Sequence, residues 1–209
     1  MDKIKDLFDF QHSVPFTDLH FKSDPHTGLQ AIVAIHSVKL GPALGGCRFI
    51  EYPDTDTAII DALRLARGMS YKAAVSGLAC GGGKSVIIKP KRVFDRESLF
   101  QAFGRFVEEL GGRYIAAKDA GTTVNDMDII AGQTKYVAST SQMSDPSPFT
   151  AHGIRRGIEA AVKFRLGKDS MDGIRVAIQG LGVGHYLAQE LHELGAQLIV
   201  CDINPQAAA

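Results

Sequence analysis

The chain has 209 residues, of which 45% are apolar, and its 23 basic and 23 acidic side chains give a formal net charge of zero. At roughly 100–200 residues per domain, this length predicts one large domain or two small ones. The apolar content is enough for a packed core, which excludes an intrinsically disordered chain. A neutral chain is also unlike a nucleic-acid wrapper or a polybasic membrane binder, so we expect neither nucleic acid nor a membrane as a partner.

The N-terminal residues and the cysteines predict a cytoplasmic protein. Residues 1–6 alternate in charge and lack the apolar core of a signal peptide. No apolar run reaches the roughly 18 residues that a membrane-spanning helix needs. Cys47, Cys80 and Cys201 form no Cys-x-x-Cys pair, which favours free thiols in a reducing compartment over disulfides or zinc. We therefore expect no metal.

Apolar periodicity and glycine positions predict alternating strands and helices over the first two thirds of the chain. The predicted elements are, in order, a strand over 28–38, a three-glycine loop over 41–46, a helix over 58–72, a chain break at 81–83, a buried strand over 85–88, a helix over 99–110 and a short strand over 114–117. Thr123 and Asp126 have the spacing of a helix capping signal, which predicts a further helix after them.

A polar, proline-bearing segment over 139–148 predicts a boundary between two domains, which would span 1–146 and 147–209. The elements predicted beyond it are a helix over 150–164, a strand over 175–179, a glycine loop over 180–184, a helix over 186–194 and a strand over 197–201. Asp202 directly follows the strand predicted over 197–201. The last four of these elements form one βαβ unit.

The glycine loop of this βαβ unit predicts a dinucleotide site. Gly180 and Gly182 permit a tight turn, at which a pyrophosphate can meet the N–H groups that begin the helix. Asp202 lies 20 residues after Gly182, where its carboxylate can bind both ribose hydroxyls and favours NAD over NADP. The full fingerprint places its third glycine at His185, whereas this chain has Gly184. The alternative is a glycine turn that only packs a helix on a sheet.

The glycine run Gly81–Gly83 precedes Lys84, but it is not a P-loop. Leu78 stands where that motif needs glycine, and a strand rather than a helix is predicted after Lys84. The glycines leave room for a ligand beside Lys84. If Lys72 faced the same cleft, each charge would lower the other's pKa, and a lysine with a pKa of about 7–8 can act as a general base. The other lysine could bind a carboxylate, and Asp119 could complete a proton relay. The alternative is two solvated lysines.

Five motifs together resemble the Glu/Leu/Phe/Val amino-acid dehydrogenase family, in particular its leucine/phenylalanine/valine branch. They follow the family's order and are GPALGGCR over 41–48, GMSYK over 68–72, GGGK over 81–84, DAGTT over 119–123 and PSPFTA over 146–151. The resemblance implies an α/β fold in which an N-terminal substrate and oligomerisation domain with a mixed sheet precedes the first βαβ part of a Rossmann NAD-binding domain. It also implies a homo-oligomer built through the N-terminal domain.

The family oxidises an L-amino acid to a 2-oxo acid and ammonia and passes a hydride to NAD. The resemblance implies that Lys84 activates the water that attacks the iminium carbon and that Asp119 shuttles protons at the amino group. The implied α-carboxylate contacts are Lys72 and the backbone of Gly45 and Gly46, and Met69 lines the same pocket. The implied NAD contacts are Thr150, at the nicotinamide amide, and Gly180, Leu181, Gly182, Val183, Gly184 and Asp202.

Leu44 and Ala117 imply a substrate with an apolar side chain. The glutamate branch of the family has lysine at the position of Leu44, where it pairs with the γ-carboxylate of the substrate. Burying that carboxylate beside Leu44 and Ala117 would be unfavourable. Leucine, valine and isoleucine stay open, because one methylene in an apolar pocket is worth only about 1–3 kcal/mol. Phenylalanine also stays open.

The resemblance implies a longer chain than 209 residues, because a Rossmann domain continues beyond its first βαβ unit. We therefore expect the N-terminal part of an NAD-dependent branched-chain amino-acid dehydrogenase. The alternatives are a truncated, inactive relic and a non-catalytic module that binds an amino acid or oligomerises.

Overall fold

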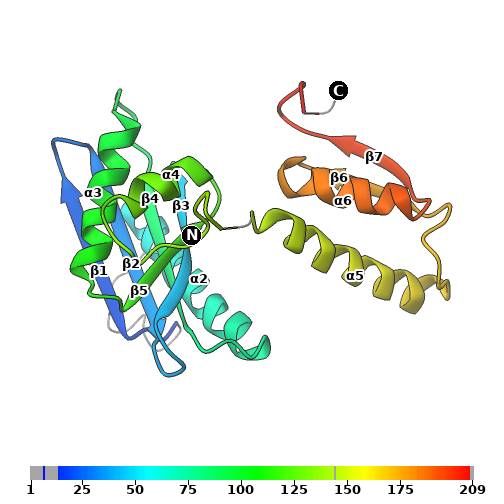
Figure 1. The fold of residues 1–209 in the computed structure, drawn as a ribbon, viewed down its shortest axis with the longest axis horizontal. Coiled ribbons are helices and arrows are strands. Elements are labelled where there is room, and N and C mark those ends of the chain that lie inside the picture. The colour runs from blue at the N-terminus through cyan, green and yellow to red at the C-terminus, as the bar shows by residue number, and fades with distance from the viewer. Residues whose placement is uncertain (1–6, 8–13, 144, 208–209) are drawn as a thin grey trace. The chain divides into compact units, whose positions relative to one another are not determined.

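The computed structural model describes residues 7, 14–143 and 145–207 and divides the chain into two compact units (Figure 1). Unit 1 is Met1–Ser144 and unit 2 is Asp145–Ala209. Residues 1–6, which lack a signal-peptide pattern, and Ser144 in the predicted boundary segment lie outside the described residues. Within the part of the chain that the structure describes, no helix has the length and apolar character needed to cross a membrane.

Unit 1 contains a five-stranded mixed sheet, as the sequence predicted for the N-terminal domain. Its strands are β1 (Asp18–Asp24), β2 (Leu29–Ser37), β3 (Ala43–Ile50), β4 (Gly81–Ile88) and β5 (Tyr114–Lys118), in the spatial order β1-β2-β4-β3-β5. The strands β3, β4 and β5 run parallel, whereas β2 is antiparallel to both β1 and β4. The carboxyl ends of β3, β4 and β5 therefore meet at one edge of the sheet.

Helices cover both faces of this sheet (Figure 1). Helix α2 (Thr55–Val75) packs its alanine- and leucine-rich side on one face, and α3 (Arg96–Glu109) and α4 (Val124–Ala131) pack on the other. Because strand side chains alternate between faces, the sheet has two cores. The larger core lies under α3 and centres on Phe100, Phe103 and Tyr114, all fully buried. Thr123 and Asp126 form the capping box of α4, which confirms the predicted helix start.

Two strands of unit 1 depart from the sequence predictions. Strand β1 was not predicted, and 43–46, predicted as loop, begins strand β3. Likewise Gly81–Gly83 does not break the chain but belongs to β4. Glycine weakens a strand unless a neighbour comes close, and here neighbours do: a Cβ on Gly45 would collide with the Gly83 carbonyl, and one on Gly82 would collide with the backbone of Ser70. The glycines are in strands because the adjoining backbones lie too close for a side chain.

Unit 2 begins with α5 (Ser147–Leu166) and continues as the predicted βαβ unit. Strand β6 (Arg175–Gln179) leads into α6 (Gly182–Glu193), and β7 (Gln197–Cys201) pairs with β6 in parallel. Both strands begin and end where the sequence predicted. Leu187 and Leu191 of α6 and Ile178 of β6 lie in the core of this unit. Helix α6 starts four residues before the predicted helix, so the last three residues of the glycine loop form its first turn.

Candidate active site

The strand alternation of unit 1 places several chemically important residues on the face that α2 covers. The Arg48 side chain of β3 donates a hydrogen bond to Asp61 of α2. Arg48 therefore points toward the face of the sheet that α2 covers. Residues at even positions of β3 and β4 therefore point toward α2. They include Leu44, Gly46 and Arg48 on β3 and Gly82 and Lys84 on β4. Asp119 directly follows the last residue of β5, beside β3.

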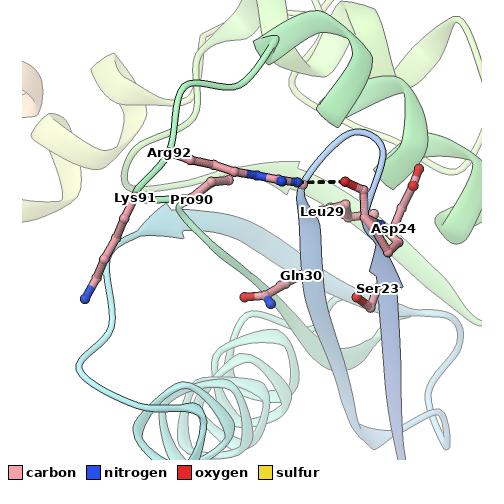
Figure 2. A pocket seen from close by; sticks show the side chains of 9 residues that line it. Ser23, Asp24, Leu29, Gln30, Pro90, Lys91 and Arg92 are labelled. Atoms are coloured by element: carbon pink, nitrogen blue, oxygen red, sulfur yellow. Dashed lines mark hydrogen bonds between the residues drawn. The ribbon is translucent and has the colours of Figure 1, made fainter.

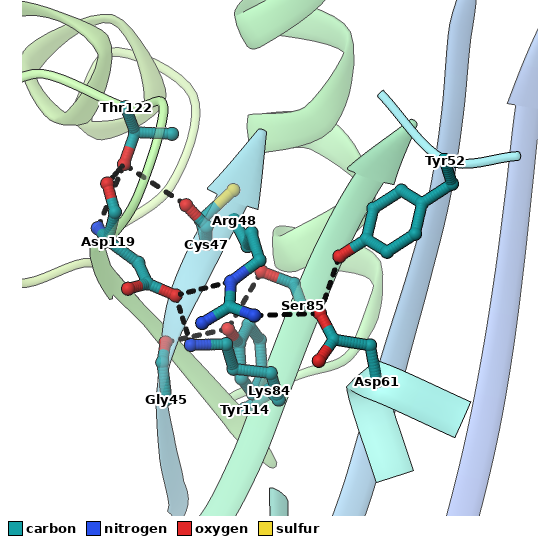
Figure 3. Close-up of polar contacts among 10 residues, drawn as sticks. All are labelled: Gly45, Cys47, Arg48, Tyr52, Asp61, Lys84, Ser85, Tyr114, Asp119 and Thr122. Atoms are coloured by element: carbon teal, nitrogen blue, oxygen red, sulfur yellow. Dashed lines mark hydrogen bonds and ion pairs between the residues drawn. The ribbon is translucent and has the colours of Figure 1, made fainter. Parts of the chain in front are cut away.

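Lys84 and Asp119 form the central contact of this face (Figure 3). The Lys84 ammonium donates a hydrogen bond to Asp119 Oδ2, and the Lys84 residue is only 5% exposed. Burial raises the pKa of Asp119, but the hydrogen bond and charge of Lys84 and the charge of Arg48 outweigh burial and leave that pKa below its ordinary value. The aspartate is therefore ionised at neutral pH and can accept a proton from a ligand.

Gly46 allows the pair to form. A Cβ at this position would lie 2.7 Å from Asp119 Cβ and 3.2 Å from Lys84 Nζ. Asp119 Cβ is next to its backbone and has little freedom to move. Gly46 therefore keeps open the space that the carboxylate and the ammonium share.

We expect Gly46→Ala to lower the free energy of unfolding of the chain by about 1–3 kcal/mol, the usual effect of overpacking a closed site. The matched control is Gly68→Ala, since a Cβ on that helical glycine meets no atom within 4 Å. Alanine is about 0.5–1 kcal/mol more favourable than glycine inside a helix, so the control should be neutral or stabilising. Urea unfolding of both variants measures the difference, and an equal effect at the two positions would contradict the assigned role of Gly46.

The loop that carries Asp119 is held at several points. Thr122 Oγ1 accepts the Asp119 N–H at 2.9 Å and lies 3.0 Å from the Cys47 carbonyl to which it donates. Arg96 of α3 donates to the Gly121 carbonyl at 2.9 Å and to both oxygens of the fully buried Asp126. The charge and hydrogen bonds of Arg96 and Thr123 keep the pKa of Asp126 low despite burial. The loop is thus tied to β3, α3 and α4.

On the opposite face of the sheet, beneath Lys84 and Asp119, the side chains of Cys47 and Tyr114 are buried and uncharged. The Tyr114 hydroxyl lies 2.7 Å from the Gly45 carbonyl and 2.9 Å from Ser85 Oγ. Burial raises the pKa of Cys47 to about 12, so this cysteine is a thiol rather than a reactive thiolate. Burial also raises the pKa of Tyr114. The reactive groups therefore face α2 and not the larger core.

The other residues predicted to contact the substrate differ in how close the structure places them to Lys84 and Asp119. Ala117 of β5 is in register with Gly46, and Leu44 is two residues before it on the same face of β3. Met69 is half-buried on α2 beside Ser70, the residue that packs on Gly82. Lys72 is exposed in the last turn of α2. A shared location of Lys72 and Lys84 stays a prediction.

The three glycines of the loop over 180–184 have different surroundings. Gly180 has a φ of +90°, a conformation that favours glycine, and Gly182 has no atom within 4 Å of a Cβ position. A Cβ on Gly184 would lie 2.9 Å from Ile178 Cγ2, so this glycine lets α6 pack on β6. In the dinucleotide fingerprint the three glycines supply a turn, an approach for the pyrophosphate, and close helix–strand packing. Gly184 can supply the third although it comes one residue early.

Asp202 and Thr150 also belong to unit 2. Asp202 Oδ2 accepts the Leu181 N–H at 2.6 Å, and hydrogen bonds from Asn204 and Leu181 lower the pKa of this carboxyl. The aspartate is therefore ionised beside the glycine loop. Val183 lies in the first turn of α6, which begins without a side-chain cap. Thr150 is exposed in the first turn of α5 and donates to the Pro146 carbonyl at 3.0 Å.

A hollow of about 420 Å³ lies away from these groups, at the turn between β1 and β2 (Figure 2). Asp24, Gln30, Lys91 and Arg92 line it, and Arg92 donates to the Pro25 carbonyl at 2.7 Å. Its lining includes neither Lys84 nor Asp119. No group of three or more metal-ligating side chains occurs in the described ranges.

Sequence reasoning missed four polar residues of the site. Arg48 faces Asp119, and Thr122 donates to the Cys47 carbonyl of β3. Tyr114 donates to the Gly45 carbonyl from the opposite face of the sheet, and Arg96 holds the loop that carries Asp119. Arg48 is part of the quoted GPALGGCR segment, and its position two residues after Gly46 indicates the same strand face once 43–50 is recognised as a strand. The roles of Thr122, Tyr114 and Arg96 depend on contacts between distant segments, for which the sequence gives no local signal.

Comparison with known proteins decides the family. The model of the Glu/Leu/Phe/Val dehydrogenase dimerisation domain matches residues 13–136. The chain belongs to the Glu/Leu/Phe/Val dehydrogenase family. It is 50% identical to the leucine dehydrogenase of Bacillus subtilis (strain 168) over 207 residues, which are 97% of this chain and 57% of that enzyme. The leucine dehydrogenase of Geobacillus stearothermophilus is also 50% identical, over 98% of this chain and 57% of its own length. The chain thus spans about half the length of the curated relatives it matches.

Solved structures support the same family and fold. The crystal structure of the L-tryptophan dehydrogenase from Nostoc punctiforme matches 97% of this chain and 58% of its own at 41% identity, with a TM-score of 0.69. A glutamate dehydrogenase from Thermus thermophilus matches 90% of this chain and 50% of its own at 24% identity, with a TM-score of 0.74, which shows the shared fold. These relatives of the family confirm the predicted α/β class.

Proposed function

We propose that this chain carries the amino-acid-binding and NAD-binding parts of a dehydrogenase for branched-chain L-amino acids. The reaction converts an L-amino acid, NAD+ and water into a 2-oxo acid, ammonium, NADH and a proton. The contact of Lys84 with Asp119 beside Gly46 carries this proposal, because it places a proton-transfer pair next to a glycine backbone in a chain 50% identical to leucine dehydrogenases.

The substrate would be bound by charge at one end and by apolar contact at the other. In this proposal Lys72 and the backbone of Gly45 and Gly46 hold the α-carboxylate. Leu44 and Ala117, which lie on the same face of the sheet, contact the substrate side chain. Neither offers a positive charge to a side-chain carboxylate, so leucine, valine and isoleucine are favoured over glutamate.

Lys84 and Asp119 would divide the proton transfers. Asp119 accepts the proton that the amino group loses as the carbon–nitrogen double bond forms, and the Cα hydride leaves for NAD, which supplies the hydride acceptor when bound. Lys84, in its neutral form, takes a proton from the water whose oxygen bonds to the iminium carbon. Asp119 then returns its proton to the nitrogen, the carbon–nitrogen bond breaks and ammonia leaves. The hydroxyl group loses its proton to solvent as it becomes the carbonyl of the 2-oxo acid, and Lys84 releases its own proton to solvent, so that ammonium and one proton result. General bases positioned in this way are typically worth about 100- to 10,000-fold in rate.

In this proposal, unit 2 binds NAD through its own residues. The open backbone at Gly182 and the uncapped start of α6 would face the pyrophosphate, with Leu181, Val183 and Gly184 completing the loop. Asp202 would bind the ribose hydroxyls. Thr150 would contact the nicotinamide amide.

Two further properties belong to the proposal. The family model that matches unit 1 is a dimerisation domain, so we propose a homo-oligomer built through this unit. We also propose a cytoplasmic location, which the free thiols of Cys47, Cys80 and Cys201 support.

The proposed reaction is tested in a chimera in which this chain replaces the segment it matches in the Bacillus subtilis leucine dehydrogenase, with the unmatched part of that enzyme retained. NADH formation is followed with leucine, valine, isoleucine, phenylalanine and glutamate. We expect turnover with the three branched-chain substrates and none with glutamate. A folded chimera without turnover on any of the five would overturn the proposed function.

Asp202→Ala should weaken NAD binding to the chimera by about 10- to 100-fold, because each lost hydrogen bond to a charged group is worth about 1.5–3 kcal/mol. NADP binding should weaken less or improve, since the charge that repels a 2′-phosphate is gone. Asp169→Ala, at an aspartate that is 77% exposed and paired with Lys163, is the control. Calorimetric titration measures both affinities, and an unchanged NAD affinity in Asp202→Ala would remove the aspartate from the site.

A further inference from the structure

Arg48 lies beside the reactive pair without a role in the reaction proposed above. It is two residues after Gly46 on β3, and its Nε is 3.4 Å from Asp119 Oδ2. That oxygen is the one to which Lys84 donates. Two cations therefore face one oxygen of one carboxylate (Figure 3).

The rest of the guanidinium is anchored on α2. Arg48 NH1 donates to Asp61 Oδ2 at 2.8 Å, and the Tyr52 hydroxyl donates to the same oxygen at 2.6 Å. These contacts fix the plane of the guanidinium, so its Nε edge is the part directed toward Asp119. Tyr52 keeps its proton, because burial and the neighbouring Asp61 both raise its pKa.

The Arg48 Nε–H is a buried donor with no hydrogen-bond partner. Such groups are rare in folded proteins and call for an explanation. At 3.4 Å, with the carboxylate bonded to Lys84, the Nε–H is near Asp119 but not bonded to it. It is in position to bond Asp119 when Lys84 moves or loses its charge.

The proposed reaction, on which this inference rests, requires Lys84 to lose its charge. Lys84 must be neutral to accept a proton from water, and Asp119, with a side chain 25% exposed, would then lose its ammonium partner. A partly buried carboxylate without a cation tends to take up a proton. Arginine cannot supply that proton at physiological pH, because its guanidinium stays charged in proteins.

We propose that Arg48 is a positioning residue whose Nε–H takes over Asp119 Oδ2 when Lys84 releases it, so that the carboxylate is in place and ionised when it accepts the proton of the amino group. The charged and titratable groups around Asp119 are consistent with this role. Lys84 faces it from β4 and Arg48 from β3, while the Cys47 thiol and Tyr114 phenol beneath are neutral. Asp61 reaches it only through Arg48. Arg48 is thus the permanent cation of this group.

The first test measures the titration of the Asp119 carboxyl carbon by NMR in the 209-residue chain, which needs no turnover. Arg48→Gln should raise the titration midpoint by about one pH unit, because an opposite charge within about 4–6 Å lowers an aspartate midpoint by 1–3 units. Lys22→Gln removes a cation that pairs with Glu109 at the end of α3, on the far face of the sheet, and should leave the midpoint unchanged. A midpoint that Arg48→Gln does not move would overturn the proposal.

A second variant covers the outcome in which Arg48→Gln fails to fold. Lys84→Met removes the first cation and leaves Arg48 in place. We expect its Asp119 midpoint to rise by less than about one pH unit, whereas a carboxylate left without any cation would titrate higher by several units. If Lys84→Met alone raises the midpoint by about one pH unit or more, Arg48 does not take over the carboxylate.

A kinetic readout in the chimera separates positioning from folding. Arg48→Gln should lower kcat for leucine by about tenfold or more with little change in KM, and should move the acid limb of kcat to higher pH, because it removes a cation beside the proton-transfer pair. Arg48→Lys keeps the charge and should restore the acid limb. If the chimera has no turnover at all, the proposed function fails, while the NMR titrations still decide the role of Arg48.

Discussion

Lys84→Ala in the chimera is expected to lower kcat for leucine oxidation by about 100- to 10,000-fold, the contribution of a general base. The variant removes the ammonium that donates to Asp119 and leaves the glycine loop of unit 2 unchanged. The affinity for NAD should therefore stay within a few-fold of the parent value. Steady-state NADH formation and calorimetric titration with NAD measure the two quantities separately.

The matched control for Lys84→Ala is Lys91→Ala, since Lys91 is an exposed lysine that lines the hollow at the β1–β2 turn. We expect normal turnover in this control. An equal loss of NAD affinity and turnover in Lys84→Ala would show that Lys84 is structural. Loss of turnover in Lys91→Ala would instead move the site to the hollow of Figure 2.

Arg96→Met should cause the largest loss of stability, about 3 kcal/mol at neutral pH. Removing one partner of a buried ion pair typically costs about 3–5 kcal/mol, and the lower end applies because the Arg96 side chain is 40% exposed. Asp126 is 0% exposed and would keep only the hydrogen bonds of its capping box. The Gly121 carbonyl would also lose its donor from Arg96.

The effect of Arg96→Met should depend on pH in a defined direction. The folded-state pKa of Asp126 is lowered, so the pair contributes stability above the unfolded pKa of about 3.9 and loses it as the pH falls through the lower folded value. The difference between parent and variant should be full at neutral pH and shrink in acid. Urea unfolding at several pH values measures it, and a difference independent of pH would mean that packing rather than charge dominates.

Much of the fold could be predicted from periodicity alone. The helices over 55–75 and 96–109 have continuous apolar faces, and the strands β6 and β7 are β-branched runs bounded by glycine and aspartate. Strand β3 could not be predicted in this way. Its Gly45 and Gly46 have low strand propensity, and they are in a strand because the Gly83 carbonyl and Asp119 approach them closely. That approach is a property of the assembled sheet.

The candidate site was likewise predicted only in part. Lys84 and Asp119 were predicted as partners from their motifs, and the structure brings them into direct contact. Arg48 was overlooked because 41–46 was predicted as a loop and no strand was predicted over the residues that follow it, so the Arg48 side chain had no expected face. Once the segment is a strand, alternation places Arg48 beside Asp119. Misassigning one element therefore hid one residue of the site.

The measurement that tests the central claim most directly locates ligand binding on the 209-residue chain. The chain is labelled for NMR and titrated with the 2-oxo acid of leucine, and shifts are followed residue by residue. We expect the largest changes at Gly46, Lys72, Lys84 and Asp119, on the face of the sheet that α2 covers. Changes confined to Gln30, Lys91 and Arg92, in the hollow at the β1–β2 turn, would contradict the assignment of the site.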